Sequence, residues 1–491
     1  METDMADNLL NAVDWSGRGL LGNWTSLAGG RIDVVEPATG LQLATTGKAN
    51  AEDVRAASAL AARSQAAWAA MPYPSRAAIF RTAAALLDTN RAQYAEWIVR
   101  ETGAIGPKAV FEIESVLHLL HEAAAMLTQP PGLVLPSQPG VVSMARRVPH
   151  GVVGVISPFN FPFLLTSRAT LPALATGNAV VLKPDPRTPV SGGVLLALLL
   201  QQAGLPEGVL SMLPGEADAG EALVTDRDVA MISFTGSTAV GRRIGELAGK
   251  HLKKVALELG GKNSLIICDD ADFDLAVSGG SWASWLHQGQ ICMSAGRHLV
   301  HESIVDAYAQ RMAEKAKQLP VGNPHTGNVA LGPIITRKQV ERVQQIVDES
   351  VRMGAKLLAG GSGEGRFYQP TVLADVTPEM PAFRDEIFGP VVCITSFASD
   401  DEAIAHANDS EYGLSAGIYT RDVGRGMAIA DRLRTGLVHV NDQTVNDDGT
   451  MPMGGRGASG NGSRHGGPAN WDEFTQWRWI TVRQTPPQYP L

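Results

Sequence analysis

The sequence predicts an α/β fold built on a doubly wound parallel sheet. Its 491 residues are too many for one hydrophobic core, so two or three domains are expected. Between residues 152 and 249, short runs rich in Val, Leu and Ile alternate with apolar patterns of helical period. Strands that alternate with helices at this spacing favour a parallel sheet with crossover helices. A second series begins at residue 263 and predicts a second α/β unit.

The region before residue 130 is expected to be helical. Residues 51–70 are rich in Ala, and residues 75–102 place apolar side chains at helical spacing. This pattern predicts two long helices separated by Pro72 and Pro74. Residues 107–127 repeat the pattern and predict another helix, which a Pro-Pro-Gly sequence ends.

The strands and helices of the two series can be placed from their apolar runs. Residues 133–156 predict strands, with a hairpin turn at Pro139 and Gly140. The first series comprises strands at 152–156, 179–182, 209–213 and 231–234 and helices at 166–175, 189–203, 217–225 and 238–249. The second comprises strands at 263–268, 391–397 and 437–441 and helices near 272–289, 303–318, 400–408 and 423–433.

Two C-terminal segments fit neither series. Residues 449–467 are so rich in Gly that they predict a loop in contact with a ligand. Residues 470–485 are predicted to be extended and contain three Trp. An exposed apolar tail of this kind would aggregate, so we expect it to dock on a partner strand.

Composition and cysteine count narrow the class of protein. The net charge is −9, and no run is rich in Lys and Arg, which disfavours a nucleic-acid partner. Cys268, Cys292 and Cys393 cannot all pair and match no zinc spacing, which favours a reduced, cytoplasmic compartment and no metal site. The acidic N-terminus does not resemble a secretory signal, and no apolar run is long enough to span a membrane. We therefore expect a soluble intracellular protein with no membrane partner.

Two candidate binding side chains follow predicted strands. Asn160 lies in the hexapeptide at 157–162, and an amide at the carboxyl end of a parallel strand is able to donate a hydrogen bond to a developing oxyanion. An ordinary Pro-Asn turn explains the hexapeptide equally well. Lys183 follows the strand at 179–182 and suits ribose hydroxyls or phosphate, although a lone lysine is more often solvated.

A candidate anion site lies at residues 234–241, Phe-Thr-Gly-Ser-Thr-Ala-Val-Gly, between a predicted strand and a predicted helix. Glycines followed by a helix N-terminus favour phosphate binding. The stretch has neither the Gly-x-Gly-x-x-Gly spacing nor the Lys-Ser/Thr ending of a P-loop. An ordinary capped helix is therefore the alternative.

Glu258 and Cys292 are the candidate reacting side chains. Glu258 stands in an apolar run followed by two glycines, so poor solvation is expected to raise its pKa toward that of a general base. Without Cys292, a capped or salt-bridged glutamate is the better interpretation. Cys292 lies in a small Gly-containing turn at 288–294, after an aromatic-rich helix. A free cysteine chosen at random is more often a core residue, so the role of this one depends on its partners.

These stretches together resemble a known family. The sequence is similar to the aldehyde dehydrogenase superfamily over roughly residues 30–485, because seven motifs recur in the same order. They are Pro-Phe-Asn-Phe-Pro at 158–162, Leu-Lys-Pro at 182–184, Phe-Thr-Gly-Ser-Thr at 234–238, Glu-Leu-Gly-Gly-Lys at 258–262, Gly-Gln-Ile-Cys at 289–292, Glu-Ile-Phe-Gly-Pro at 386–390 and Gly-Gly-Arg-Gly-Ala-Ser-Gly at 454–460. Residues 289–298 and 441–447 look most like benzaldehyde dehydrogenases and related enzymes that oxidise aromatic aldehydes.

The resemblance implies a role for each reacting side chain. The Cys292 thiolate would attack the aldehyde, and the Asn160 amide and the backbone N–H of Cys292 would hold the oxyanion. After hydride transfer to a nicotinamide, Glu258 would activate the water that hydrolyses the thioester. A nucleophilic thiolate needs a depressed pKa, which nearby donors usually supply. Gln476 stands where some relatives carry a glutamate for proton release, so the relay is expected to use Glu258 and water alone.

The implied cofactor is NAD, and NADP stays open as well. Relatives strict for NAD often carry an acidic residue three positions after the lysine, where this sequence has Pro186 followed by Arg187. The implied cofactor-binding residues are Ser157, Phe159, Lys183, Gly215, Gly236, Ser237, Val240, Gly241, Leu259, Glu386 and Phe388.

The residues expected to form the substrate pocket are mostly apolar, which favours an uncharged, aromatic aldehyde. They are Phe161, Leu164, Arg168, Leu286, Ile291 and Met293. A buried Arg168 guanidinium would instead be able to select a carboxylate. The alternatives are an enzyme that acylates coenzyme A, one that acts on aliphatic aldehydes or semialdehydes, and a non-catalytic NAD-binding protein.

The resemblance also implies the domain division and the assembly. Residues 1–128 and 149–258 would form the dinucleotide-binding domain, and residues 259–469 the α/β catalytic domain that carries the nucleophilic cysteine. Residues 129–148 and 470–491 would form an oligomerisation hairpin and a C-terminal strand. The expected assembly is a homodimer or a homotetramer.

Overall fold

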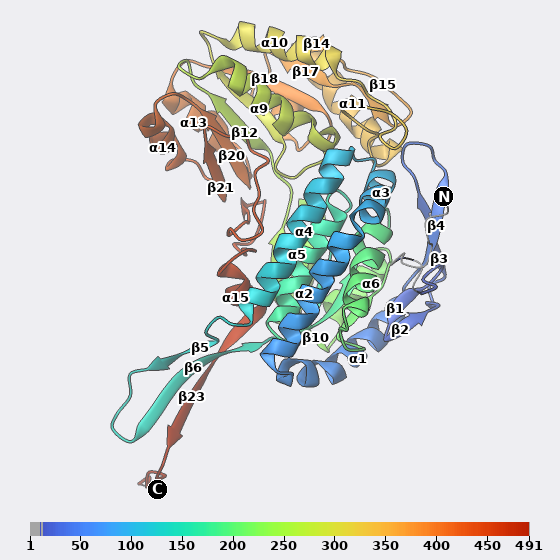
Figure 1. Cartoon of the computed structure of the whole chain (residues 1–491). Coiled ribbons are helices and arrows are strands. Elements are labelled where there is room, and N and C mark those ends of the chain that lie inside the picture. Colours follow the sequence, from blue (N-terminus) through green and yellow to red (C-terminus); the bar gives the residue numbers. More distant parts are fainter. Residues whose placement is uncertain (1–9, 11–12, 491) are drawn as a thin grey trace.

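The computed structural model describes residue 10 and residues 13–490. Figure 1 shows two α/β bodies, one above the other, and a narrow sheet that projects from the lower body. In the described part of the chain, no helix has the length and apolar character needed to cross a bilayer.

The lower body is built on a seven-stranded sheet with the order β11-β10-β7-β8-β9-β1-β2. The five strands β7 to β11 are parallel, and the two N-terminal strands add an antiparallel edge. Their bounds are β1 Gly19–Leu21, β2 Asn23–Thr25, β7 Val152–Ile156, β8 Ala179–Lys183, β9 Leu210–Met212, β10 Val229–Thr235 and β11 Lys254–Glu258. The central strands β7 and β8 are buried throughout, as expected for a sheet covered on both faces.

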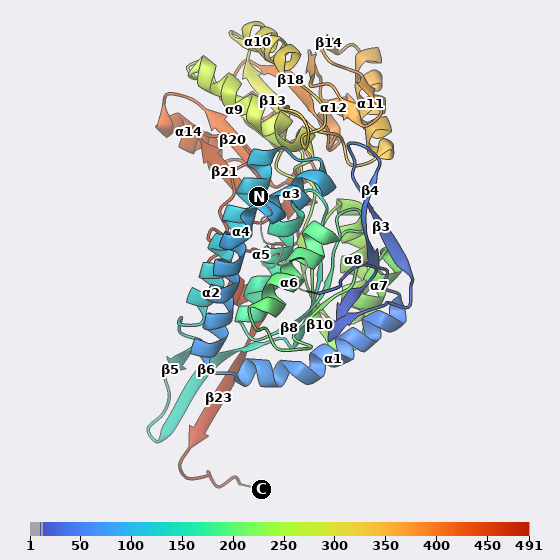
Figure 2. The same cartoon turned by 45° about the vertical axis from the view of Figure 1, so that its right-hand side comes forward.

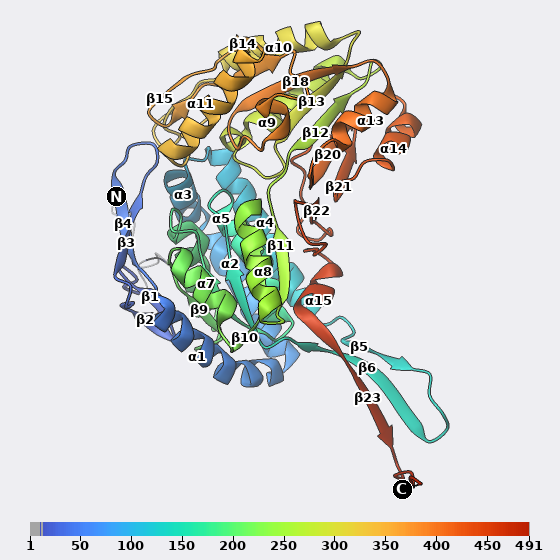
Figure 3. The same ribbon diagram turned by 180° about the vertical axis from the view of Figure 1, so that it is seen from behind.

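Helices cover both faces of this sheet. Figure 1 shows α2, α4, α5 and α6 on one side, and Figure 3 shows α7 and α8 on the other. The bounds are α1 Ala51–Ala70, α2 Tyr73–Thr89, α3 Arg91–Thr102, α4 Gly106–Met126, α5 Pro162–Ala175, α6 Leu195–Gln202, α7 Ala217–Thr225 and α8 Thr238–Lys250. A π-helical turn, Val190–Val194, precedes α6. The predicted doubly wound arrangement is confirmed.

The predicted helix at residues 75–102 is wrong, because the structure has two helices there. The buried Asn90 separates α2 from α3, and its side-chain amide donates to the carbonyl of Leu86 (2.8 Å). That bond takes up one of the last carbonyls of α2 and ends the helix. Pro74 does not interrupt α2, since it lies in the first turn, where its missing N–H costs nothing.

The upper body has a second seven-stranded sheet with the order β14-β17-β18-β13-β12-β20-β21. All neighbours pair in parallel except β14 with β17 at the edge. The strands are β12 Asn263–Ile267, β13 Ala295–His301, β14 Lys356–Ala359, β17 Thr371–Ala374, β18 Val391–Phe397, β20 Ser415–Tyr419 and β21 Leu437–Val440. The helices are α9 Phe273–Trp285, α10 Val305–Gln318, α11 Arg337–Arg352, α12 Pro381–Arg384, α13 Asp400–Asn408 and α14 Val423–Ala430.

Among the described residues, three small two-stranded sheets complete the two bodies. They are β3 Arg31–Val35 with β4 Gln42–Gly47, β15 Gly363–Glu364 with β16 Phe367–Tyr368, and β19 Tyr412–Gly413 with β22 Arg456–Gly457.

The projecting sheet, called the arm below, consists of β5 Gly132–Leu135, β6 Val141–Pro149 and β23 Thr475–Arg483. Figure 2 shows it extending away from both bodies. The predicted turn is present before β6, with Gly140 at a φ of 76°. The C-terminal segment docks on β6 as an antiparallel strand, from Thr475 opposite Pro149 to Arg483 opposite Val141. Its first residues were predicted to be extended, but they form the short helix α15 Ala469–Phe474.

Candidate active site

Cys292 lies in a turn between α9 and β13 whose backbone is strained. Three successive residues adopt left-handed conformations, His287 (φ 49°), Gln288 (φ 57°) and Gly289 (φ 67°). Such angles cost energy for residues with a side chain and persist only where the surroundings enforce them. Gln288 supplies part of that enforcement, because its amide donates to the carbonyls of Gly103 (3.0 Å) and Pro333 (2.8 Å).

Asn263, at the start of β12, ties this turn to the chain that follows Glu258. Its side-chain amide donates to the carbonyls of Cys292 and Ser294, each at 2.8 Å. The backbone of Gly261 packs closely against this turn, since an added Cβ would lie 2.6 Å from the Cys292 carbonyl oxygen. The sequence offered a signal for this contact, since Asn263 directly follows the Glu-Leu-Gly-Gly-Lys motif, but its role was not predicted.

The thiol of Cys292 is poorly disposed to ionise. Burial, followed by the charges of Glu386, Glu258 and Asp447, raises its pKa to about 12, and the opposing charge of Arg168 is smaller. The expectation of a depressed thiol pKa is therefore wrong for this structure. Attack by the thiolate needs a group that takes the proton.

Glu258, the last residue of β11, is such a group. Only 4% of its surface is exposed, and burial raises its pKa well above the ordinary value, as predicted from the sequence. The Arg464 and Arg168 charges and the Gly455 N–H oppose this shift without cancelling it. Within the described residues, neither carboxylate oxygen accepts a hydrogen bond of good geometry. The carboxyl group is thus available to exchange protons.

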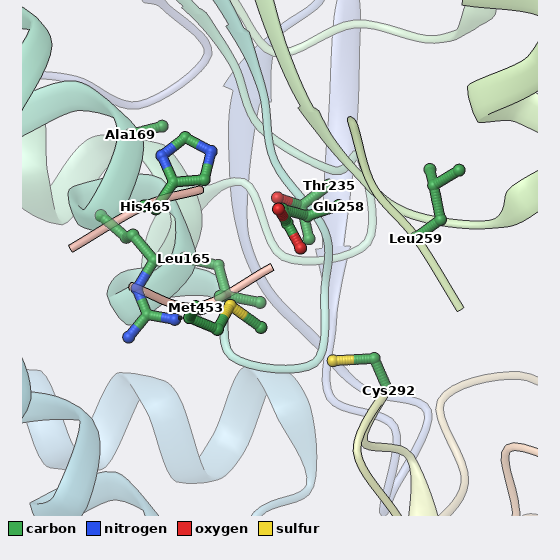
Figure 4. A pocket seen from close by; sticks show the side chains of 9 residues that line it. Leu165, Ala169, Thr235, Glu258, Leu259, Cys292, Met453 and His465 are labelled. Atoms are coloured by element: carbon green, nitrogen blue, oxygen red, sulfur yellow. Dashed lines mark hydrogen bonds between the residues drawn. The ribbon is translucent and has the colours of Figure 1, made fainter. Parts of the chain in front are cut away.

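Glu258 and Cys292 face the same small cavity, of about 20 Å³, as Figure 4 shows. This volume is close to that of a single water-sized probe. The other side chains around it are Leu165, Arg168, Ala169, Thr235, Leu259, Met453 and His465. Burial lowers the pKa of His465 to about 3, so the ring contributes no charge at neutral pH.

Most of the predicted pocket residues lie elsewhere. Arg168 lines the small cavity, but Phe161, Leu164, Ile291 and Met293 are buried in the main hydrophobic core, and Leu286 packs against it. Leu165, Met453 and His465 line the cavity and were not predicted.

Arg168 does not present a free positive charge to this cavity. Its guanidinium forms a buried ion pair with Asp447, with 2.5 Å between Nη2 and Oδ2, and Nη1 lies 3.2 Å from the sulfur of Met453. An aldehyde that carries a carboxylate would have to compete with Asp447 for the guanidinium.

A second cavity, of about 760 Å³, lies at the carboxyl ends of the parallel strands β7, β8 and β10. Open α/β sheets bind ligands at this edge. Cys292 and Asn160 line it, together with nine of the predicted cofactor residues: Ser157, Phe159, Lys183, Gly236, Ser237, Val240, Leu259, Glu386 and Phe388. Its volume and its mixture of apolar and charged groups suit a dinucleotide.

Gly215 and Gly241 do not line this cavity, and their contact with the cofactor stays a prediction. A Cβ on Gly241 would lie 2.3 Å from the Leu259 side chain, and one on Gly215 would lie 2.7 Å from Ala219. Both glycines instead permit close packing behind the cavity wall.

Charged groups in the large cavity are held in place. Glu386 accepts the N–H of Gly261 (2.9 Å), and burial raises its pKa to about 7. Burial lowers the pKa of Lys183. Arg187 lies 4.1 Å from the centroid of the Phe159 ring and pairs with Asp185.

Gln476 lies outside this machinery. It is exposed on β23, opposite Val148 of the arm, and lines neither cavity. A proton relay that uses Glu258 and water alone stays a prediction.

Comparison with known proteins agrees with this geometry. Residues 24–480 match the sequence profile of the aldehyde dehydrogenase family. The chain is 53% identical to vanillin dehydrogenase of Amycolatopsis sp. (99% of this chain, 100% of the relative) and 52% identical to the NAD(+) benzaldehyde dehydrogenase of Pseudomonas putida (97% and 98%). An NAD+ complex of an aldehyde dehydrogenase from Bacillus cereus superposes with a TM-score of 0.92 at 33% identity, covering 95% of this chain and 96% of that one.

Proposed function

The chain belongs to the aldehyde dehydrogenase family, and from that premise we propose that it oxidises aromatic aldehydes to carboxylic acids. One observation carries the assignment of roles: Cys292 lines both cavities, with Glu258 in the small one and the predicted cofactor residues around the large one. A nucleophile at that junction reaches a substrate on one side and a hydride acceptor on the other.

The proposed reaction begins with loss of the Cys292 proton to Glu258, whose raised pKa makes it a better base than an ordinary glutamate. The Cys292 sulfur then bonds to the carbonyl carbon, and the carbonyl oxygen becomes an oxyanion. The side-chain amide of Asn160 and the backbone N–H of Cys292 stabilise it. Residues that line the large cavity, such as Lys183 and Glu386, would hold a nicotinamide cofactor, which would supply the hydride acceptor. Loss of hydride from the thiohemiacetal carbon would leave a thioester on Cys292. Glu258 then passes its proton to solvent water and, ionised again, deprotonates the water that attacks the thioester. The C–S bond breaks, the acid leaves, and the Cys292 sulfur takes back the proton from Glu258.

The aromatic preference rests on the names of the similar enzymes and on the cavity wall. Leu165, Ala169 and Met453 are apolar, and Asp447 already neutralises Arg168. We expect higher kcat/KM for benzaldehyde and vanillin than for a short aliphatic aldehyde or an acidic semialdehyde. A preference for either of the latter would contradict the proposal. Product analysis with and without coenzyme A tests the acylating alternative, which the presence of Glu258 disfavours.

NAD is the proposed cofactor. The three arginines that line the large cavity are already paired with carboxylates: Arg187 with Asp185, Arg243 with Glu221 and Arg342 with Asp385. None of the three therefore offers a free guanidinium to a 2′-phosphate. Initial rates at equal concentrations of the two cofactors should favour NAD. Faster turnover with NADP would reverse the assignment.

The proposed assembly is a homodimer or a homotetramer formed through the arm. Leu133, Val134 and Trp479 are exposed on it, and β5 is an edge strand with unpaired backbone groups. We also propose that the dinucleotide-binding and catalytic domains divide at residues 258 and 259, between the two sheets. Light scattering tests the assembly, and a monomer would contradict it.

A further inference from the structure

A fully buried ion pair on α4 takes no direct part in the proposed reaction. Lys108 and Glu112 lie one helical turn apart, and both side chains have 0% exposure. Removing two charges from water is costly, and apolar residues in place of such a pair are often neutral or stabilising. Stability alone is therefore a weak explanation for this pair, and its contacts suggest another.

Lys108 contacts both Asn160 and the next residue, Phe161. Its ammonium donates to the backbone carbonyl of Asn160 (2.7 Å) and lies 4.2 Å from the centroid of the Phe161 ring. A hydrogen bond from a charged donor is stronger than one between neutral groups, and a cation over an aromatic face adds to it.

Glu112 holds the next residues. Its Oε2 accepts the N–H groups of Phe163 and Leu164, both at 3.1 Å. These N–H groups belong to the first turn of α5, where they have no partner within the helix, and a carboxylate there also complements the helix dipole. The pair on α4 thus fixes residues 160–164 at two points.

The Asn160 side chain connects this fixed segment to the Cys292 turn. Its amide donates to the carbonyl of Gln290 (2.9 Å), two residues before Cys292. Gln290 is itself held, because its side-chain oxygen accepts the N–H of Ile335 (3.0 Å). The amide has a second N–H, whose direction relative to Cys292 depends on where the backbone of Asn160 lies.

We propose that Lys108 and Glu112 are positioning residues that hold Asn160 where its amide meets the oxyanion formed on Cys292. The inference rests on the proposed function, which makes Asn160 the oxyanion donor. A donor displaced by a fraction of an ångström loses much of its effect on the transition state.

The test is a mutant cycle on the full-length enzyme. In the double variant Lys108→Met, Glu112→Gln, the glutamine keeps an acceptor for the two N–H groups of α5, and the methionine fills space without donating to Asn160. The matched control, Glu101→Gln, changes another fully buried carboxylate that accepts two backbone N–H groups, those of Val190 and Ser191, and does not contact Asn160. Each is made with Asn160 intact and in an Asn160→Ala background, and kcat/KM for benzaldehyde and the Kd for NAD are measured.

We expect the double variant to lower kcat/KM roughly tenfold when Asn160 is present, and to have no further effect when Asn160 is absent. The control should stay within about twofold of the wild type, and NAD binding should not change. An equal loss in both backgrounds, or no loss in either, would overturn the positioning role while the proposed reaction stands. Full activity of Asn160→Ala itself would instead refute the oxyanion assignment, and the positioning role with it.

A double variant that fails to bind NAD is replaced in the cycle by Lys108→Arg, which keeps a charged donor of a different shape. The loss it causes should likewise require Asn160, and a loss independent of Asn160 would contradict the inference.

Discussion

The two cavities that meet at Cys292 differ in how ready they are for their ligands. The large one offers about 760 Å³ at the ends of parallel strands, and the small one about 20 Å³ between α5, Met453 and His465. An aromatic ring is far larger than a water molecule, so the small cavity must widen to admit one. Met453 and Leu165 are flexible side chains in its wall, and their movement would widen it. We infer that the cofactor binds a preformed cavity, whereas the substrate binds a cavity that widens when it enters.

Cys292→Ala should distinguish the roles of the two cavities most clearly, because it should abolish oxidation and leave cofactor binding intact. Oxidation of benzaldehyde should fall by roughly 10⁴-fold or more, because the covalent route is lost. The large cavity keeps its other walls, so the Kd for NAD, measured by fluorescence titration, should change by less than about twofold. Residual activity near that of the wild type would show that the thiol is not the nucleophile.

Glu258→Gln tests the small cavity alone. We expect kcat to fall roughly 10²- to 10⁴-fold, since the base that activates water is gone. If some acylation persists, one equivalent of reduced cofactor should form before turnover stalls, and mass spectrometry should find the acyl group on Cys292. Steady turnover without an adduct would contradict the assignment.

Asp447→Asn tests whether the ion pair keeps the small cavity electrically neutral. The substitution removes the charge that opposes Arg168. The ratio of kcat/KM for 4-carboxybenzaldehyde to that for benzaldehyde should rise about tenfold. Arg168→Met is the matched control and should not raise this ratio. An unchanged ratio in Asp447→Asn would mean that Arg168 is not accessible to the substrate.

The smallest effect concerns the thiol pKa and the wall of the large cavity. Because the pKa of Cys292 is raised to about 12, its alkylation by iodoacetamide should accelerate continuously from pH 7 to pH 10 as the thiolate fraction grows. Glu386 is the carboxylate that raises this pKa most. Glu386→Gln should therefore lower the pKa of Cys292 by about one unit or less. Alkylation at pH 8 should become severalfold faster as a result. A plateau below pH 9 would contradict the raised pKa.

The sequence predicted the cofactor side better than the substrate side, and the reason is geometric. Residues that follow parallel strands meet at one edge of the sheet wherever their strands lie, so local motifs located Asn160, Lys183 and Glu258. The wall of the small cavity depends instead on which face of α5 is turned toward it. Leu165, Arg168 and Ala169 share one face of α5 at i, i+3 and i+4, whereas Leu164 is directed into the core. Without the true helix start at Pro162, that face was not predictable.

Long-range partners explain the missed strand β13. Arg297 and His298 make it look exposed, yet both are buried. Arg297 donates to the carbonyls of His406 and Ala407 at the end of α13, and His298 bonds Ser284 and Tyr308. Polar residues satisfied by distant parts of the chain leave no periodic pattern along the sequence.

The pairing of β23 with β6 has a consequence for biosynthesis. Trp479 donates to Ser143, which precedes it by 336 residues, so the arm cannot be completed until Arg483 has left the ribosome. Until then, β6 presents an open edge bearing Val142 and Met144. Subunits that join through the arm would therefore associate only after residue 483 has been made, and a ribosome stalled before residue 475 would release a chain prone to aggregate through that edge.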